Sequence, residues 1–503
     1  MKTYDALIIG AGHNALVTAA YLAKAGKSVL VLERREMIGG VAVTETLAAG
    51  LKVDSILSGG FLRPDIVRDL NLSRFEELQP APMKTNLVSL LADKRQLSLS
   101  SNVSETAEAI SPFSKPDAAR WAGFVTFMDK AAAFLEAAYA TPMPRLPKTP
   151  LADGLPLAQL ALKLRGLGAK DMYTVIRLLP MTVREFLDEW FESDILKAAI
   201  ASLGIHNANL GVMSAGSAFN LLHQYLIRGG WGQPLPVHGI AQIPAALAAA
   251  ARASGVEIRT EAEVTRILVK DGQVTGLLLS NGEELHAPLV ISSADPRRTF
   301  LTLVAPEHLD PEFVWKVQNI KMRGVTARVH ISLDGPSNLP ASTFVIAPGL
   351  NYLERAYDAA KYGQISEKPY LEVTTSGEIV SIHMQFVPYH LKGATWEAAT
   401  RDRLETLVID TLAEHIPDLK TRIKAKKSIT PLDLENTYAL TEGDPHHGQL
   451  MLDQFFFMRP LPGWSNHLTP LTGLYLCGSG THGGGGISGI PGRNATRQIL
   501  KTG

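Results

Sequence analysis

Residues 5–33 read DALIIGAGHNALVTAAYLAKAGKSVLVLE, and this stretch decides the fold. A short apolar run that ends in glycine is typical of a buried parallel strand. From His13 onward the apolar residues have helical spacing, and Gly26 is a suitable residue for the end of that helix. Residues 27–33 form a second apolar run. The stretch therefore predicts a strand, a helix and a second strand, which together begin a doubly wound α/β fold.

The first turn of this unit has the residue types that a dinucleotide requires. Gly10 permits a tight turn, Gly12 lets a pyrophosphate approach the backbone, and Ala15 is small enough for the helix to lie close to the strand. Glu33 follows about 20 residues later, where a carboxylate can accept hydrogen bonds from a ribose diol. The predicted contacts in the turn are Gly10, Gly12, His13, Asn14 and Ala15.

A second glycine turn decides between the two common dinucleotides. NAD and FAD both satisfy the first turn and Glu33, but the chain continues as RREMIGGV over residues 34–41. This second turn would pass beside the diphosphate and ribityl chain of a longer cofactor, which favours FAD. The predicted contacts here are Arg34, Gly39, Gly40 and Val41.

Near the end of the chain, residues 473–495 read GLYLCGSGTHGGGGISGIPGRNA. The pattern predicts a strand over 474–477, a glycine loop, and a helix with Pro491 in its first turn. The free N–H groups at such a helix start attract negative charge, so we expect them to face the pyrimidine end of a reduced flavin. The predicted contacts are Gly478, Ser479, Gly486, Ile487 and Ser488, and His482 is the candidate for proton transfer.

These residues resemble the phytoene desaturase and carotenoid isomerase-like flavoproteins, and most closely the branch named after pyridine nucleotide-disulfide oxidoreductase domain-containing protein 2. The two ends of the chain carry the resemblance together with SAGSAFNLLHQYL at 214–226 and HHGQLMLDQFFFMRP at 446–460. It covers nearly the whole chain. Two departures stand out: Val41 occupies a position where many relatives have arginine, and His238-Gly239 replaces a pair of glycines.

The resemblance implies an α/β fold with a Rossmann-type FAD-binding domain and an inserted α+β substrate domain. Residues 1–75, 235–300 and 441–503 would form the FAD-binding domain, and the backbone at Val264 would touch the adenine. Residues 76–234 and 301–440 would form the substrate domain with a helical insert. The FAD would be bound noncovalently.

The expected function is an FAD-dependent oxidoreductase that acts on an apolar or lipid-like substrate by hydride transfer to flavin N5. A redox-neutral isomerase, an amine oxidase and a flavin-bound interaction protein without turnover stay open as alternatives. The sequence does not fix the substrate or the electron acceptor.

Composition excludes other classes of function. The 49 Lys and Arg residues balance 49 Asp and Glu residues, so a nucleic acid is not an expected partner. The single cysteine, Cys477, excludes an internal disulfide and suits a reducing compartment. No metal motif is present, and we expect the adjacent His446 and His447 to be solvated or to cap a loop. We expect Asp453 and Arg459 to pair with each other or with the backbone, and a contact with substrate stays open as the alternative.

The first apolar run is interrupted by glycines and does not read as a signal peptide, and no apolar run is long enough to cross a membrane. We expect a cytoplasmic protein. Residues 155–191 combine apolar side chains with Lys163, Arg165, Lys170 and Arg177. This stretch either packs on the substrate domain with its charges in water, or lies on a membrane surface as a peripheral contact.

Overall fold

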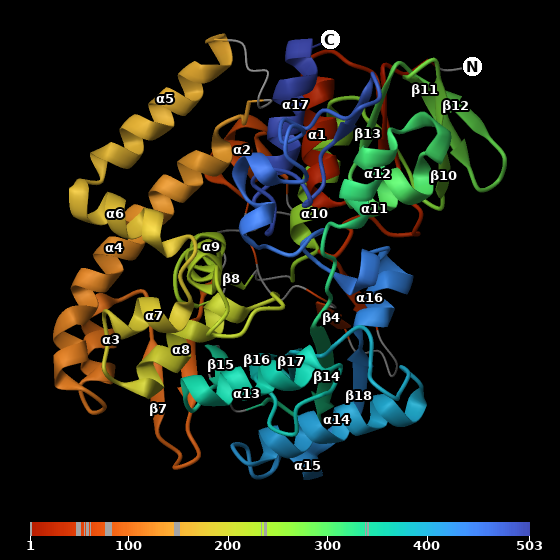
Figure 1. Cartoon of the computed structure of the whole chain (residues 1–503). Coiled ribbons are helices and arrows are strands. Elements are labelled where there is room, and N and C mark those ends of the chain that lie inside the picture. The colour runs from red at the N-terminus through yellow and green to blue at the C-terminus, as the bar shows by residue number, and fades with distance from the viewer. Residues whose placement is uncertain are drawn as a thin grey trace.

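The computed structural model describes residues 3–46, 52–54, 56, 60, 62–75, 83–144, 151–232, 234–235, 239–337, 339 and 342–502. A five-stranded parallel sheet organises one part of the molecule, at the upper right in Figure 1. Its strand order is β19-β13-β1-β2-β9. These strands are β1 (Ala6–Ile9), β2 (Val29–Leu32), β9 (Glu257–Arg259), β13 (Leu289–Ser292) and β19 (Leu474–Leu476).

This sheet is buried on both faces, which explains the unbroken apolar run of β1. Ile8 packs into one core with helices α1 (His13–Lys24), α10 (Gln242–Ala253) and α17 (Ile490–Thr502). Leu7 and Ile9 pack into a second core on the opposite face. That face is covered by the three-stranded sheet β10 (Val264–Lys270), β11 (Gln273–Leu279) and β12 (Glu284–His286), and by α12 (Pro311–Gln318).

A seven-stranded sheet organises the other part, at the bottom of Figure 1. Its order is β18-β14-β17-β16-β15-β6-β7, and its pairs are antiparallel except β15 with β6. One face packs against α14 (Ala398–Ala413). The strands are β6 (Asn86–Leu90), β7 (Gln96–Leu99), β14 (Thr326–Leu333), β15 (Ser342–Ile346), β16 (Leu371–Ser376), β17 (Ile379–Gln385) and β18 (Ile423–Ile429).

Helices between the two sheets form the left side of Figure 1, around an aromatic core that includes Trp121, Phe124 and Trp231. Helix α5 projects from this group as an arm at the upper left, joined to α4 and α6. These helices are α3 (Val103–Ile110), α4 (Lys115–Ala140), α5 (Leu151–Gly166), α6 (Ala169–Leu178), α7 (Val183–Asp188), α8 (Asp194–Ile205) and α9 (Ser217–Arg228).

Shorter elements complete the description. The helices are α2 (Pro64–Asp69), α11 (Pro296–Arg298), α13 (Leu350–Lys361), α15 (Leu419–Arg422) and α16 (Pro431–Tyr438). Strands β3 (Thr44–Thr46) and β4 (Lys52–Asp54) pair, as do β5 (Met83–Lys84) and β8 (Pro234–Leu235). Single helical turns are η2 (Leu72–Arg74), η3 (Thr299–Leu303), η4 (Pro306–His308), η5 (Thr441–Gly443), η6 (Leu452–Gln454) and η7 (Phe456–Met458).

The predicted α/β fold class is confirmed, and its local elements lie close to their predicted positions. The helix from His13 ends at Lys24, two residues before Gly26, and the predicted strand over 474–477 is one residue shorter. Pro491 lies in the first turn of α17. The exact domain boundaries stay a prediction. Among the described residues, no helix combines the length and apolar character needed to cross a membrane.

Candidate cofactor site

A cleft opens at the carboxyl ends of β1, β2 and β13, where the strand order of the sheet reverses. In doubly wound folds this is the place where ligands bind. The space outside protein atoms in this cleft, including the solvent at its open mouth, is about 1010 Å³. The predicted contacts that line it are Gly10, Gly12, His13, Asn14, Ala15, Glu33, Arg34, Gly39, Gly40, Val41, Val264, Gly478 and Ser479.

The first glycine turn leaves room at the start of helix α1. Gly10 has φ +86°, and a Cβ there would lie 2.6 Å from the Ser293 hydroxyl, so only glycine suits this position. Gly12 is different, because no atom lies within 4 Å of its Cβ position. It caps α1 without a side-chain hydrogen bond, and the first turn of α1 has no acidic residue. Open space beside uncapped N–H groups fits the pyrophosphate of a dinucleotide.

The second glycine turn packs directly against the first. The Gly39 N–H donates to the Ala11 carbonyl at 2.9 Å. Gly40 has φ +61°, and a Cβ there would lie 3.2 Å from the Gly12 Cα. The two turns therefore form one continuous wall of backbone along the cleft, which a side chain at Gly40 would disturb.

Glu33 stands at the end of β2 with only 7% of its surface exposed. One carboxylate oxygen accepts from the Ala11 N–H at 2.8 Å, and the other accepts from the Arg35 N–H at 3.0 Å. A carboxylate has about four acceptor positions, so about two remain for the hydroxyls of a ribose. The protein itself thus fixes the orientation of this side chain at the edge of the cleft.

Cationic side chains also line the cleft, although Val41 supplies none. Arg34 donates to the Asn436 carbonyl at 3.1 Å, and Arg35 forms an ion pair with Glu45. Arg298 lines the cleft as well, and in the described ranges no hydrogen bond or ion pair involves its side chain. Sequence reasoning missed Arg298, although its position shortly after the strand β13 is a signal for the same strand edge. His238 lies outside the described residues.

The glycine loop before α17 packs against protein, and its residues 486–488 do not themselves line this cleft. A Cβ on Gly486 would lie 3.1 Å from the Ile227 side chain, and Ile487 is buried against Gly60. The Ser488 hydroxyl accepts from the Ile490 N–H. Of the predicted contacts in this region, only Gly478 and Ser479 line the cleft, and a flavin contact at residues 486–488 stays a prediction.

His482 lies outside the cleft lining and is 1% exposed. Its Nε2 lies 3.1 Å from the Ala138 carbonyl at the end of α4, so Nε2 carries the proton and donates. Burial lowers the pKa of His482 to about 4, which keeps the imidazole neutral near pH 7. Its role in proton transfer stays a prediction, and its observed contact joins the glycine loop to α4.

Of the pair His446-His447, predicted to be solvated or to cap a loop, His446 is not solvated. His446 is buried, with 4% of its surface exposed, and His447 lines the cleft. Arg459 holds this segment, because its buried guanidinium donates to the carbonyls of His446, Gly448 and Ser479. The predicted backbone pairing of Arg459 is thus confirmed, whereas no contact with Asp453 forms within the described part of the chain.

Comparison with known proteins agrees with this geometry. The family model described as flavin containing amine oxidoreductase matches residues 16–492. The chain is 32% identical to pyridine nucleotide-disulfide oxidoreductase domain-containing protein 2 of Rattus norvegicus, covering 99% of this chain and 93% of the rat protein. It is 23% identical to a component of the limonene dehydrogenase of Castellaniella defragrans, over 100% and 95% of the two chains. A phytoene desaturase (neurosporene-forming) of Cereibacter sphaeroides is 27% identical over 55% of this chain and 56% of that protein.

Solved structures share the fold over the full length. An oxidoreductase from Methanosarcina mazei superposes with a TM-score of 0.60 at 17% identity, covering 99% of both chains. Cyclohexylamine oxidase from Brevibacterium oxydans superposes with a TM-score of 0.57 at 18% identity, covering 100% of this chain and 99% of that one.

Proposed function

Because this chain belongs to the flavin-containing amine oxidoreductase family and has FAD as its cofactor, we propose that it dehydrogenates an apolar, lipid-like substrate. FAD in such a site accepts hydride at flavin N5. The residues proposed to hold it are the paired glycine turns at Gly12 and Gly40, the carboxylate of Glu33 on the ribose, and the cationic Arg298. No described side chain is assigned as the catalytic acid or base.

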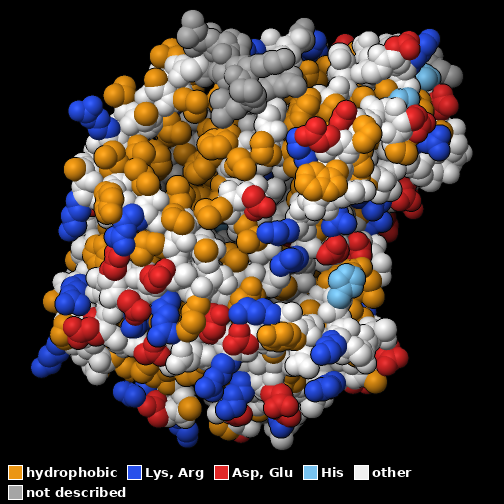
Figure 2. All heavy atoms as spheres, viewed as in Figure 1, with side chains coloured by type: hydrophobic (Ala, Val, Ile, Leu, Met, Phe, Trp, Pro, Cys, Tyr) orange, Lys and Arg blue, Asp and Glu red, His pale blue; other side chains and the backbone are white. Residues whose placement is uncertain are grey.

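The observation that carries the proposal is an apolar surface on α5 and α6, within the predicted substrate domain. Leu155 and Leu162 on α5 are 63% and 67% exposed, and Tyr173 on α6 is 63% exposed. Figure 2 shows apolar side chains gathered at the upper left, over the helices α4 to α6. A patch of this kind is a candidate for contact with apolar ligands or membranes.

Charge supports a lipid surface as the partner of this patch. Residues 151–178, which span α5 and α6, hold Lys163, Arg165, Lys170 and Arg177 against Asp153 and Asp171, so this segment is positive although the whole chain has a net charge of zero. Exposed apolar side chains that alternate with cations favour an anionic lipid interface. We therefore propose that α5 and α6 contact a membrane peripherally, which would bring the enzyme to a lipophilic substrate.

A second exposed apolar surface, at η6 and η7, is connected with the glycine loop by aromatic side chains. Phe457 and Leu452, in η7 and η6, are 46% and 47% exposed. Next in the chain, the Phe456 ring lies 6.2 Å from Tyr139 and 6.3 Å from His482, which belongs to the glycine loop. These contacts connect an exposed apolar surface with the loop that follows β19. The names of the relatives that act on limonene and phytoene favour the same class of substrate.

Anaerobic flavin reduction tests the proposal. Purified protein is mixed with terpenes, carotenoid precursors and long-chain lipids, and in parallel with primary and secondary amines. We expect an apolar compound to remove the absorbance of oxidised flavin. Reduction by amines alone would identify an amine oxidase, and conversion of a substrate without net reduction would identify an isomerase. If no compound of either set reduces the flavin, the result would favour a flavin-bound interaction protein without turnover.

Vesicle binding tests the membrane contact separately. The parent should sediment with vesicles that contain phosphatidylserine, and Leu162→Asp should weaken this binding. Tyr362→Asp is the matched control, because Tyr362 is 70% exposed but directly follows the end of α13, away from the patch. Equal binding by all three proteins would contradict the proposed surface.

A further inference from the structure

Two buried histidines bind the backbone of the glycine loop from different helices. His13, the first residue of α1, has its Nε2 3.2 Å from the Gly486 carbonyl. His223 in α9 has its Nε2 3.1 Å from the Gly485 carbonyl. A carbonyl oxygen can only accept a hydrogen bond, so Nε2 carries the proton in both rings.

Both rings are neutral near pH 7. Burial lowers the pKa of His13 and of His223 to about 4. With its proton on Nε2, His223 can use Nδ1 as an acceptor, and the Tyr139 hydroxyl donates to it at 2.8 Å. In His223, Nε2 therefore donates to the glycine loop, and Nδ1 accepts from Tyr139 of α4.

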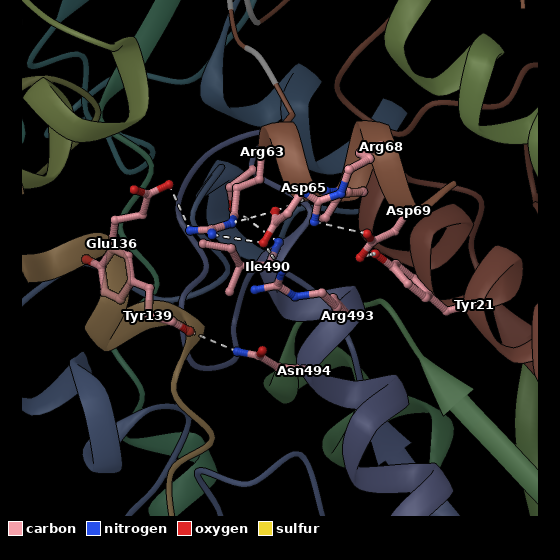
Figure 3. Close-up of polar contacts among 12 residues, drawn as sticks. Tyr21, Arg63, Asp65, Arg68, Asp69, Glu136, Tyr139, Ile490, Arg493 and Asn494 are labelled. Carbon is pink, nitrogen blue, oxygen red and sulfur yellow. Dashed lines mark hydrogen bonds and ion pairs between the residues drawn. The ribbon is translucent and has the colours of Figure 1, made fainter. Parts of the chain in front are cut away.

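The end of α4 is in turn attached to α17. Figure 3 shows Asn494 of α17 next to Tyr139, and the Asn494 side chain donates to the Tyr139 carbonyl at 2.9 Å. In the same view Arg63 contacts Asp65 and Glu136, which joins α2 to α4. The glycine loop is therefore held by fixed contacts on several sides rather than acting as a flexible connector.

Binding of the two carbonyls orients the adjoining N–H groups. In a trans peptide the C=O and N–H point in opposite directions. With the carbonyls of Gly485 and Gly486 turned toward His223 and His13, the N–H groups of Gly486 and Ile487 point away from these rings. Within the described residues neither N–H donates to the protein. Ile487 is only 4% exposed, and a buried backbone N–H requires an acceptor.

Glycine is necessary for this arrangement. A Cβ on Gly485 would lie 2.7 Å from the His223 Nε2, and Gly485 has φ +119°. A side chain at this position would displace the imidazole from the carbonyl. The glycine at 485 and the histidine at 223 thus depend on each other.

We propose that His13 and His223 are positioning residues of the FAD site, which set the glycine loop so that the N–H groups of Gly486 and Ile487 donate to the pyrimidine ring of the flavin. Donors fixed there stabilise the negative charge of reduced flavin more than the neutral oxidised form. The two histidines therefore raise the midpoint potential of the bound FAD. This inference rests on FAD binding and not on the identity of the substrate, so its failure and that of the proposed dehydrogenation are distinguishable.

The first test compares His13→Leu with His13→Gln. Leucine removes the donor, whereas the glutamine amide nitrogen can take the place of Nε2. We expect His13→Leu to lower the midpoint potential and to weaken FAD binding about tenfold, and His13→Gln to restore both toward the parent. Equal values in the Leu variant and the parent would overturn the role of His13.

The second test uses His223, which lies outside the cleft lining. His223→Gln keeps a donor for Gly485 but loses the acceptor for Tyr139, and His223→Asn keeps the acceptor and loses the donor. We expect the potential to fall in the Asn variant and to stay near the parent value in the Gln variant. If the potential instead falls in the Gln variant and not in the Asn variant, the hydrogen bond with Tyr139 controls the potential, and the proposal is overturned.

His467→Leu is the control for loss of a buried imidazole. His467 is 4% exposed, and its Nδ1 lies 3.0 Å from the Leu476 carbonyl, so it resembles the two histidines but does not bind the loop. We expect it to lower the temperature of unfolding without changing the potential. A shift in potential as large as that of His13→Leu would show a general effect of destabilisation, and would refute a specific role of the loop.

Discussion

Removal of the Glu33 side chain should weaken FAD binding and also lower the stability of the FAD-free protein, and the two effects can be measured separately. Its carboxylate accepts from Ala11 and Arg35 N–H groups at 2.8 and 3.0 Å, and the residue lines the cleft. A hydrogen bond to a charged group contributes about 1.5–3 kcal/mol. If one such bond to the ribose is lost in Glu33→Ala, the Kd for FAD should rise about 10- to 150-fold.

The same variant should also be less stable without FAD. Ala11 is fully buried, so its N–H loses its acceptor at a cost of about 1–3 kcal/mol. Fluorescence titration of FAD-free protein, well below the unfolding temperature, gives the Kd, and urea denaturation gives the stability. Glu263→Ala is the matched control, because Glu263 lines the same cleft without a hydrogen bond to its carboxylate among the described residues. A Kd within about twofold of the parent in Glu33→Ala would refute the ribose assignment.

Three further outcomes follow from the glycines and the buried histidines. Gly12→Ala should change the stability of the FAD-free protein by no more than about 1 kcal/mol, because its φ of −69° suits alanine whereas alanine is unfavourable at a helix N-cap. The same change should weaken FAD binding; urea denaturation and FAD titration measure the two effects. Gly486→Val should destabilise the FAD-free protein because its Cβ meets Ile227, and adding Ile227→Ala should restore part of the loss, whereas a flexible linker would show no loss. The free energy of unfolding should fall as pH drops from 6.5 toward 4. Burial lowers the pKa of His223 and His482 to about 4 in the folded protein, so the unfolded chain binds protons at a higher pH than the folded one. Equal stability at about pH 7.5 and about pH 5 would contradict this.

The parts of the site that sequence predicts are those fixed by neighbouring residues. The turn at Gly10 and Gly12 and the carboxylate of Glu33 belong to one strand–helix–strand unit, whose geometry is nearly the same wherever it occurs. Gly39 and Gly40 follow a few residues later. All of these residues line the cleft, because the local backbone already determines where they point.

Arg298 and His447 were not predicted, because their positions depend on contacts between distant segments. Arg298 reaches the cleft because β13 pairs with β1, as in the register of Ile9 with Ser292. His447 reaches it because Arg459 binds the neighbouring carbonyls of His446 and Gly448. The position of Arg298 shortly after β13 does indicate this strand edge, whereas no pattern around His447 indicates that Arg459 binds the neighbouring carbonyls.

Glycine residues show a further limit of prediction from sequence. Glycine occurs both where a ligand needs open space and where two backbone segments pack closely. At Gly12 the space is open, and the sequence correctly suggests an approaching ligand. At Gly484 a Cβ would lie 1.9 Å from the Ser479 carbonyl, and at Gly492 it would lie 2.2 Å from the Asn14 carbonyl. Here the backbone itself comes close, so these glycines allow α17 to pack on α1 and the loop to fold on itself. Close packing of this kind leaves the loop carbonyls accessible to His13 and His223. The effect of the glycine loop on FAD should therefore depend on fixed hydrogen bonds from the protein, and not on flexibility.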